Sequence, residues 1–249
     1  MKFIFSAFLL LSFVFANYAQ TTTTASPDKL ITEFDINGLK VILKRRPSSP
    51  TVSAGLFTRG GVKNQTAENA GIENLTLSTA AEASKKFPRD VRRKEFSKTG
   101  STIGSGMSND FGVMSLSSTR QHFDRTWEIF TDIVLNPSFA PEDFQRVREQ
   151  LLTGLRNRTI SPDSFLDSLE EKVIYAKHPY ENDPNGTIET VSKLKITDLQ
   201  AYHKNLLQTS RLLLVIVGDL DAETVKKQIT ASFGKLPRGN YKEPVTQSI

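Results

Sequence analysis

Few side chains in this 249-residue sequence have types and spacing that could do chemistry. Cysteine is absent, which excludes disulfide scaffolds, thiolate-bound zinc, iron–sulfur clusters and thiol catalysis. The three histidines are His122, His178 and His203. None stands in a local pattern of metal ligands, and none lies in a local motif that suggests Ser-His-Asp catalysis. We expect His178, in a His-Pro-Tyr segment, to be structural and His203, in a polar stretch, to be exposed.

The charge pattern argues against a nucleic-acid-binding protein. There are 32 basic and 27 acidic residues, giving a formal net charge of +5. Short basic clusters occur at 44–46 and 92–94, but neither is interleaved with aromatic residues as in single-strand binding. We interpret both clusters as solvated faces and expect no nucleic acid partner.

The N-terminus has the pattern of an export signal. Residues 1–19 consist of a Lys2 n-region, the apolar run Phe3–Ala16 and a small residue, Ala19, at a plausible cleavage point. Residues 20–29 are a polar, flexible leader. We expect a periplasmic or secreted protein with no membrane contact after signal removal, although an uncleaved N-terminal anchor is an alternative.

Strands and helices alternate in the remainder. Ile31–Ile36 and Leu39–Arg45 alternate apolar and polar residues around Asn37-Gly38, which predicts a hairpin with a type I′ turn. Further strands are expected at 51–58, 102–107, 113–119 and 212–217, the last as a buried central strand. Helices are expected at 69–86, 92–99, 122–135, from Pro141 onward, and at 161–176, 196–207 and 221–233.

These elements must position any site, and their order predicts one α+β domain over residues 30–237. The sheet is expected to be mostly antiparallel, with helices packed on one face. Phe123, Trp127, Phe130 and Val134 recur at helical spacing, which is typical of a core-facing stripe. Residues 238–249 are polar and are interpreted as a linker or tail.

Several stretches, in this order and spacing, resemble the insulinase-like, or M16, metallopeptidases, a family that includes pitrilysin and the mitochondrial processing peptidase. The resemblance covers about residues 30–237 and implies a single N-terminal-type M16 domain. The stretches that carry it are Gly38–Ile42, Ser53–Gly61, Ala70–Ile72, Asn136–Phe139, His178–Tyr180, Gly186-Thr187, Asp198-Leu199 and Val215–Asp219.

The resemblance also implies where a zinc site would lie. Active members carry His-x-x-Glu-His on the first site helix and a third ligand, a Glu, about seventy-five residues later. Here those positions are Asn74, Leu77 and Ser78, and the third ligand falls within Gln150–Leu155, with Gly154 the best match. Asn and Ser are poor zinc ligands, and Leu and Gly offer none. We therefore expect no bound zinc or other cofactor and no catalytic residues.

The functional expectation is a non-catalytic M16 homologue that pairs with an active zinc peptidase subunit and helps bind peptide. Two alternatives stay open at this stage. One is a structural assembly subunit without a peptide role, and the other is a peptidase with a rebuilt active site. A companion with an intact His-x-x-Glu-His motif encoded beside this chain would favour the first interpretation. The chain could also be the N-terminal half of a longer subunit.

Overall fold

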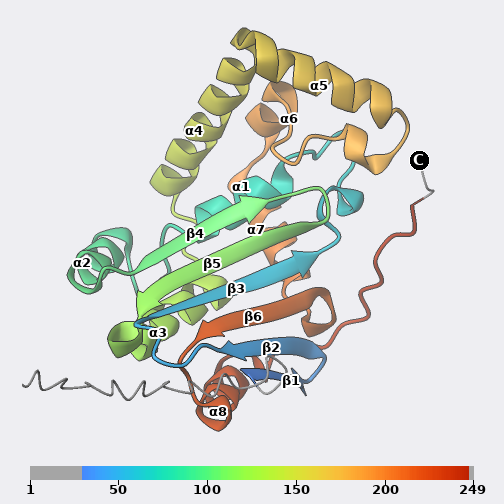
Figure 1. The fold of residues 1–249 in the computed structure, drawn as a ribbon. Helices are drawn as coiled ribbons and strands as arrows, with labels where there is room; N and C mark the ends of the chain where they lie inside the picture. The colour runs from blue at the N-terminus through green and yellow to red at the C-terminus, as the bar shows by residue number, and fades with distance from the viewer. Residues whose placement is uncertain (1–29, 247–249) are drawn as a thin grey trace, which may run out of the picture.

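The described part of the chain is built around a six-stranded sheet with the strand order β1-β2-β6-β3-β5-β4 (Figure 1). The computed structural model describes residues 30–246, so the predicted signal peptide and leader lie outside the described residues. The strands are β1 (Ile31–Ile36), β2 (Leu39–Arg45), β3 (Thr51–Arg59), β4 (Thr102–Met107), β5 (Phe111–Thr119) and β6 (Leu212–Gly218).

All neighbouring strands are antiparallel except β2 and β6, which confirms the mostly antiparallel sheet. The predicted hairpin joins β1 to β2. Asn37 and Gly38 at its tip have φ angles of 53° and 93°, as a type I′ turn requires. The apolar run of β6 lies between β2 and β3, so the prediction of a central strand is confirmed.

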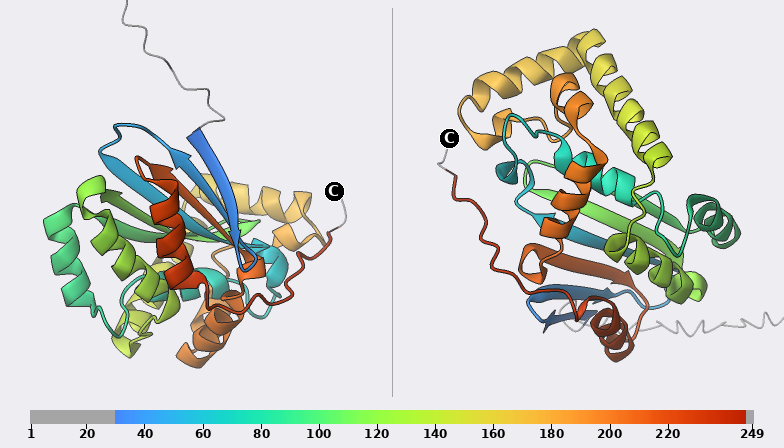
Figure 2. Two further views of the ribbon diagram at one scale, coloured as in Figure 1. Left: turned by 90° about the horizontal axis from the view of Figure 1, so that it is seen from below. Right: turned by 180° about the vertical axis from the view of Figure 1, so that it is seen from behind.

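The helices lie on one face of the sheet, as predicted (Figure 2). In β2, β3, β5 and β6 every second residue is therefore buried beneath them, and most of these residues are apolar, whereas the other face carries exposed side chains such as Ser53, Ser115 and Ser117. The helices are α1 (Ile72–Ala80), α2 (Arg89–Thr99), α3 (Phe123–Leu135), α4 (Pro141–Ile160), α5 (Pro162–Ile174), α6 (Ile188–Lys193), α7 (Ile196–Leu206) and α8 (Ala222–Phe233).

The core fills the space between the sheet and these helices. The predicted aromatic stripe of α3 is buried there, with Trp127 5.7 Å from Phe130 and 6.0 Å from Phe233 of α8, ring centre to ring centre. Leu39, Leu214 and Ile216 are fully buried on the same face of the sheet. Among the described residues, no helix is both long and apolar enough to span a bilayer.

Helix α1 is shorter than the predicted 69–86. It begins after Gly71, whose φ of 88° is left-handed, and ends at Ala80. Beyond it the chain pairs instead with the loop at 136–138. The Ser138 N–H donates to the Ala83 carbonyl, and the Lys85 N–H donates to the Asn136 carbonyl. Backbone groups that a longer helix would bond internally therefore find partners outside it. Helix α6 was not predicted at all.

Candidate functional site

Helix α1 carries two of the predicted site residues side by side. The Ser78 hydroxyl donates to the Asn74 side-chain oxygen at 3.1 Å, as residues four apart on a helix can do. The Asn74 amide donates to the Asn185 side-chain oxygen at 2.7 Å, and the Ser78 hydroxyl lies 3.0 Å from that of Ser105 on β4. The two side chains are therefore held by neutral hydrogen bonds.

Asn74 and Ser78 face a hollow of about 400 Å³. The hollow lies between α1, the edge strand β4 and helix α4. Its other lining residues are Ala81, Glu82, Arg92, Ile103, Gly104, Ser105, Val147, Gln150 and Leu151. The geometry thus brings one side of α1 against the strand and helix that would enclose a site.

Leu77 does not join them. It is 4% exposed and lines a small gap in the core with Leu56, Met114 and His203. A three-residue offset displaces Leu77 from Asn74 around the helix, and this side chain turns toward the sheet. Of the three motif positions, Asn74 and Ser78 therefore line the hollow, whereas Leu77 lies in the core.

Gly154 lies on α4, one turn beyond Gln150 and Leu151 of the hollow. It is exposed, and a Cβ atom built there would meet no other atom within 4 Å. The position therefore has room for a longer side chain. In this chain it contributes no functional group.

The residues present do not fit a zinc ion. Zn²⁺ sites in proteins use imidazole, thiolate and carboxylate ligands, whereas Asn74, Ser78 and Ser105 offer a neutral amide and two hydroxyls. The one carboxylate of the hollow, Glu82, is paired with Arg92 and Arg146. In the described part of the chain, no three His, Asp or Glu side chains are grouped so that they could hold a metal ion.

Comparisons with known proteins agree with this architecture. Residues 40–182 match the sequence profile of "Insulinase (Peptidase family M16)", which is more than half of the chain. The chain belongs to the insulinase family. Residues 193–248 match a second profile of that family, "Peptidase M16 inactive domain".

Individual relatives of this insulinase-family chain are distant. It is 22% identical to bovine "Cytochrome b-c1 complex subunit 1, mitochondrial" over 94% of its length and 48% of that protein. It is also 22% identical to "Non-peptidase homolog YmxG" of Helicobacter pylori over 86% of its length and 50% of that protein. The chain therefore spans about half the length of these curated relatives.

A solved structure shows the same fold. The crystal structure of a "peptidase M16 inactive domain" from Pseudomonas fluorescens superimposes with a TM-score of 0.80. The sequences are 20% identical, and the match covers 88% of this chain and 54% of that one. The predicted single α+β domain of M16 type is confirmed.

The other side of α1 in this insulinase-family domain holds a buried ion pair that the sequence did not reveal. Glu73 is 0% exposed, and its carboxylate accepts from the Arg211 guanidinium at 2.9 Å. The hydroxyls of Thr58 and Tyr202 donate to the same carboxylate at 2.5 and 2.6 Å. Burial raises the pKa of Glu73, while Arg211 and the two hydroxyls oppose that rise. The one sequence signal was a carboxylate within an otherwise apolar and neutral helix.

Two of the histidines also take structural positions. His203 is 8% exposed, not exposed as expected, and its Nε2 lies 2.8 Å from the Val134 carbonyl oxygen. Its apolar neighbours on α7 and α3 enclose it, and this burial lowers its pKa. The His178 Nδ1 accepts from the Tyr180 N–H at 3.2 Å and so caps the short helical turn at Pro179–Glu181.

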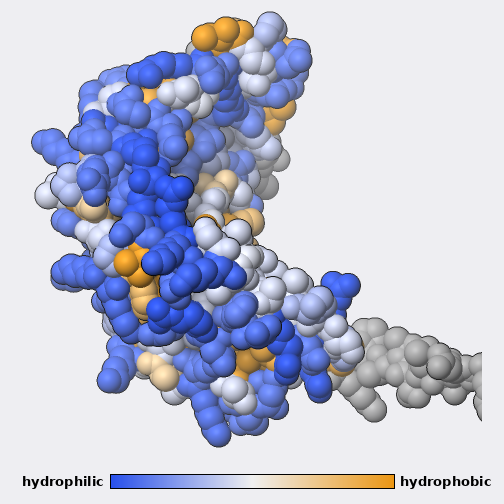
Figure 3. Space-filling model, turned by 90° about the vertical axis from the view of Figure 1, so that its left-hand side faces the viewer, coloured by the Kyte–Doolittle hydropathy of each residue, from blue (hydrophilic) through white to orange (hydrophobic). Residues whose placement is uncertain are grey.

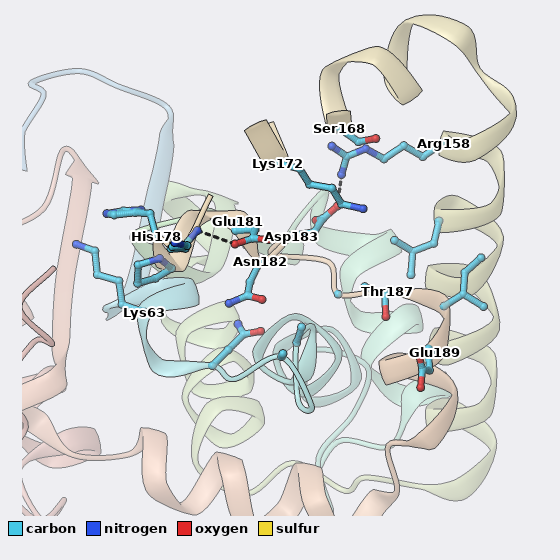
Figure 4. A pocket seen from close by; sticks show the side chains of 18 residues that line it. Lys63, Arg158, Ser168, Lys172, His178, Glu181, Asn182, Asp183, Thr187 and Glu189 are labelled. Atoms are coloured by element: carbon cyan, nitrogen blue, oxygen red, sulfur yellow. Dashed lines mark hydrogen bonds and ion pairs between the residues drawn. The ribbon is translucent and has the colours of Figure 1, made fainter. Parts of the chain in front are cut away.

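A second, larger cavity of about 880 Å³ lies between α4, α5, the loop 177–189 and the segment before α1 (Figure 4). The Asn74–Asn185 hydrogen bond lies between the two hollows, because Asn74 lines the smaller one and Asp183 and Gly186 line the larger one. No sequence motif indicated this second cavity.

Proposed function

We propose that this chain is a non-catalytic member of the insulinase family that is exported, pairs with a zinc-bearing subunit of the same family and helps to hold peptide. The observation that carries the proposal is the Asn74–Ser78 pair. It occupies the helix side where active relatives are expected to carry two histidines, and it faces an intact hollow. This arrangement supports a site that keeps its enclosure, with an amide and a hydroxyl at the two histidine positions and its one carboxylate, Glu82, paired with arginines.

Edge strand β4 supports the peptide role. It is the last strand of the sheet order, so one side of its backbone has no strand partner among the described residues. Gly104 and Ser105 of this strand line the same hollow as Asn74 and Ser78. An extended peptide can add to such an edge through main-chain hydrogen bonds, with its side chains entering the neighbouring hollow.

Helix α5 supports the pairing role. None of its side chains is buried, and apolar residues cover one side of it, extending to Ile160 at the end of α4. Figure 3 shows apolar surface at the top of the molecule, where α4 and α5 meet. The exposed fractions are 77% for Ile160, 55% for Leu166 and 78% for Val173. A contiguous exposed apolar patch is typical of a protein–protein interface.

Co-expression tests the pairing. The chain is produced with a companion subunit, encoded beside it, that carries an intact His-x-x-Glu-His motif. We expect a stable complex in gel filtration and greater peptide cleavage than the companion shows alone. Leu166→Asp with Val173→Asp should abolish the complex without unfolding the chain, because both side chains are exposed.

The control is Arg93→Asp with Lys94→Asp on α2, which places two aspartates at exposed positions on another helix. It should leave the complex intact. Absence of a complex with wild-type chain, or a complex that survives the α5 variant, would contradict the pairing surface.

A second candidate is a structural assembly subunit without a peptide role. It is favoured by the similarity to a protein named as a subunit of the cytochrome b-c1 complex. The same co-expression separates the two functions. A complex whose peptide affinity and cleavage rate equal those of the companion alone would support the assembly role.

A further inference from the structure

A row of hydrogen-bonded side chains runs from the edge strand β4 across α1 to the loop at 183–185. The Ser105 hydroxyl lies 3.0 Å from that of Ser78, which lies 3.1 Å from the Asn74 side-chain oxygen. The Asn74 amide nitrogen lies 2.7 Å from the Asn185 side-chain oxygen. The Asn185 amide nitrogen in turn lies 3.1 Å from a carboxylate oxygen of Asp183. All five residues are partly exposed, so the row is accessible from outside the core.

The carboxylate at the end of this row fixes the direction of every hydrogen bond in it. A carboxylate only accepts, so the Asn185 amide nitrogen faces Asp183 and the Asn185 oxygen faces Asn74. Asn74 therefore donates to Asn185, and its own oxygen accepts the single proton of Ser78. Because Ser78 has no second proton, Ser105 is the donor between the two hydroxyls. Both hydroxyl protons of the row are thus committed within it.

These commitments leave two free groups at the hollow beside β4. Ser105, Ser78 and Asn74 all line this hollow. In the described part of the chain, no donor is hydrogen-bonded to the Ser105 oxygen, and the second Nδ2 proton of Asn74 has no acceptor. The row ends on a carboxylate, which polarises its members and makes the Ser105 oxygen a stronger acceptor. The hollow therefore offers an acceptor on β4 and a donor on α1.

The charged groups at the hollow are already paired. Glu82, the one carboxylate among its lining residues, lies 2.7 Å from Arg146 and 3.5 Å from Arg92. Arg89 and Asp143 complete the network, which holds three guanidinium groups and two carboxylates. A cationic ligand therefore finds no free carboxylate among the lining residues. We infer that the neutral groups make the selection.

We propose that the hollow binds the primary amide of an Asn or Gln side chain in a peptide added to β4. The amide nitrogen donates to the Ser105 oxygen, and the amide oxygen accepts from the Asn74 Nδ2. Only the Ser78 hydroxyl lies between these two groups, so one amide can reach both. A hydroxyl carries its donor and its acceptor on one atom and reaches only one of them.

The size of the hollow fits this ligand. Its volume of about 400 Å³ is sufficient for one such side chain. A carboxylate of the same length lacks the donor, an amine lacks the acceptor, and a thioether lacks both. This inference rests on the proposed peptide role and names the class of peptide.

Fluorescence anisotropy with four labelled peptides tests the inference. The first is a decapeptide of alternating Gln and Thr, which places every Gln on one side of an extended strand. The others have Glu, Lys or Met in place of every Gln. We expect the Gln peptide to bind and the other three to bind at least about tenfold more weakly, because each leaves a polar group of the hollow unpaired.

The decisive variant is Ser105→Ala. It removes the acceptor for the amide and leaves the hydrogen bonds from Ser78 to Asn74 and from Asn74 to Asn185 in place. Ser105 is partly exposed on an edge strand, so circular dichroism should be unchanged. We expect about a tenfold loss of affinity for the Gln peptide and little change for the Met peptide, which makes no hydrogen bond to this oxygen. Ser117→Ala makes the same change at an exposed position of β5 and should have no effect.

The outcomes separate this inference from the proposed function. If the Glu or the Met peptide binds as well as the Gln peptide, or if Ser105→Ala binds the Gln peptide normally, the amide site is wrong while the peptide role stands. Equal losses for the Gln and Met peptides in Ser105→Ala would also overturn it, because Ser105 would then act through the shape of the strand. If none of the four peptides binds, the proposed peptide role fails together with the inference.

Discussion

The two sides of helix α1 differ sharply in what their polar residues do. On the sheet side, Glu73 is fully buried and anchored by Arg211, Tyr202 and Thr58. On the side of the hollow, Asn74 and Ser78 are partly accessible, and each makes two neutral hydrogen bonds. Adjacent residues of one helix therefore serve stability in one case and an open surface in the other.

This difference indicates that the chain keeps the family's packing around α1 and differs from active members on the side that faces the hollow. The buried side connects α1 to β3, to α7 and to Arg211 in the turn before β6, and removing any one member would leave a charge or a polar group in the core. The open side faces the hollow and makes only neutral hydrogen bonds to Asn185 and Ser105, so its residues can change at small cost to the fold. Loss of the expected zinc ligands is therefore compatible with a well-packed domain.

The largest expected effect comes from breaking the buried side. Glu73→Gln leaves the Arg211 guanidinium buried without its counter-charge, and we expect a loss of about 3–5 kcal/mol in the free energy of unfolding. Asn74→Ala, the neighbouring change on the open side, should cost only about 1 kcal/mol. Urea unfolding of both variants measures the difference.

The double variant Glu73→Met with Arg211→Met checks the cause. Because it removes both charges, it should recover a large part of the stability lost in Glu73→Gln. Equal losses for Glu73→Gln and Asn74→Ala would show that the two sides of α1 do not differ as described.

The next largest change in stability is expected when zinc ligands are introduced on the side of α1 that faces the hollow. We expect Asn74→His, Leu77→Glu, Ser78→His and Gly154→Glu together to create a zinc site, with Gly154 offering room for the new side chain. Zinc at about a hundred times its dissociation constant should then stabilise the variant by about 2.7 kcal/mol. Thermal melts with zinc and with chelator measure this shift.

Leu77 makes this experiment demanding. Its side chain turns toward the core, so a glutamate there is buried and costly unless metal binding draws it toward the hollow. The matched control omits Leu77→Glu and keeps the three other changes. If the variant folds but its melting temperature is the same with zinc and with chelator, the alignment of these positions with the family motif is wrong.

The smallest expected effect is a pH dependence of the stability that arises from a buried histidine. His203, which shares a core gap with Leu77, has a pKa lowered by burial from its ordinary value of 6.5. The unfolded chain then binds a proton more readily than the folded chain, so stability should fall as the pH drops below about 6.5. His203→Gln should flatten this part of the stability–pH curve. If wild-type protein and His203→Gln have the same stability–pH curve, burial of His203 does not cause the expected loss of stability at low pH.

Local patterns predicted the elements better than they predicted the site. The Asn37-Gly38 turn, the α3 stripe and the central apolar strand could all be read from neighbouring residues, because periodicity and turn chemistry are local. The early end of α1 depends on backbone pairing with residues 136–138, which no local pattern reveals. The helical propensity of Ala81–Lys86 was overridden by that tertiary contact.

The same limit applies to the polar groups. Glu73 and Arg211 are 138 residues apart in sequence, and the burial of His203 depends on packing between α7 and α3. The larger cavity is assembled from four separate segments. By contrast, the neighbourhood of Asn74 and Ser78 followed from their spacing on one helix, whereas the direction of Leu77 required the position of the sheet.

The zinc content of the purified wild-type chain tests the central claim most directly. The protein is expressed without added zinc, passed through gel filtration and analysed by inductively coupled plasma mass spectrometry, with the four-residue zinc-site variant as positive control. Because an amide and hydroxyls replace imidazole and carboxylate ligands, we expect far less than one zinc ion per wild-type chain. One tightly held zinc ion per chain would contradict the non-catalytic account.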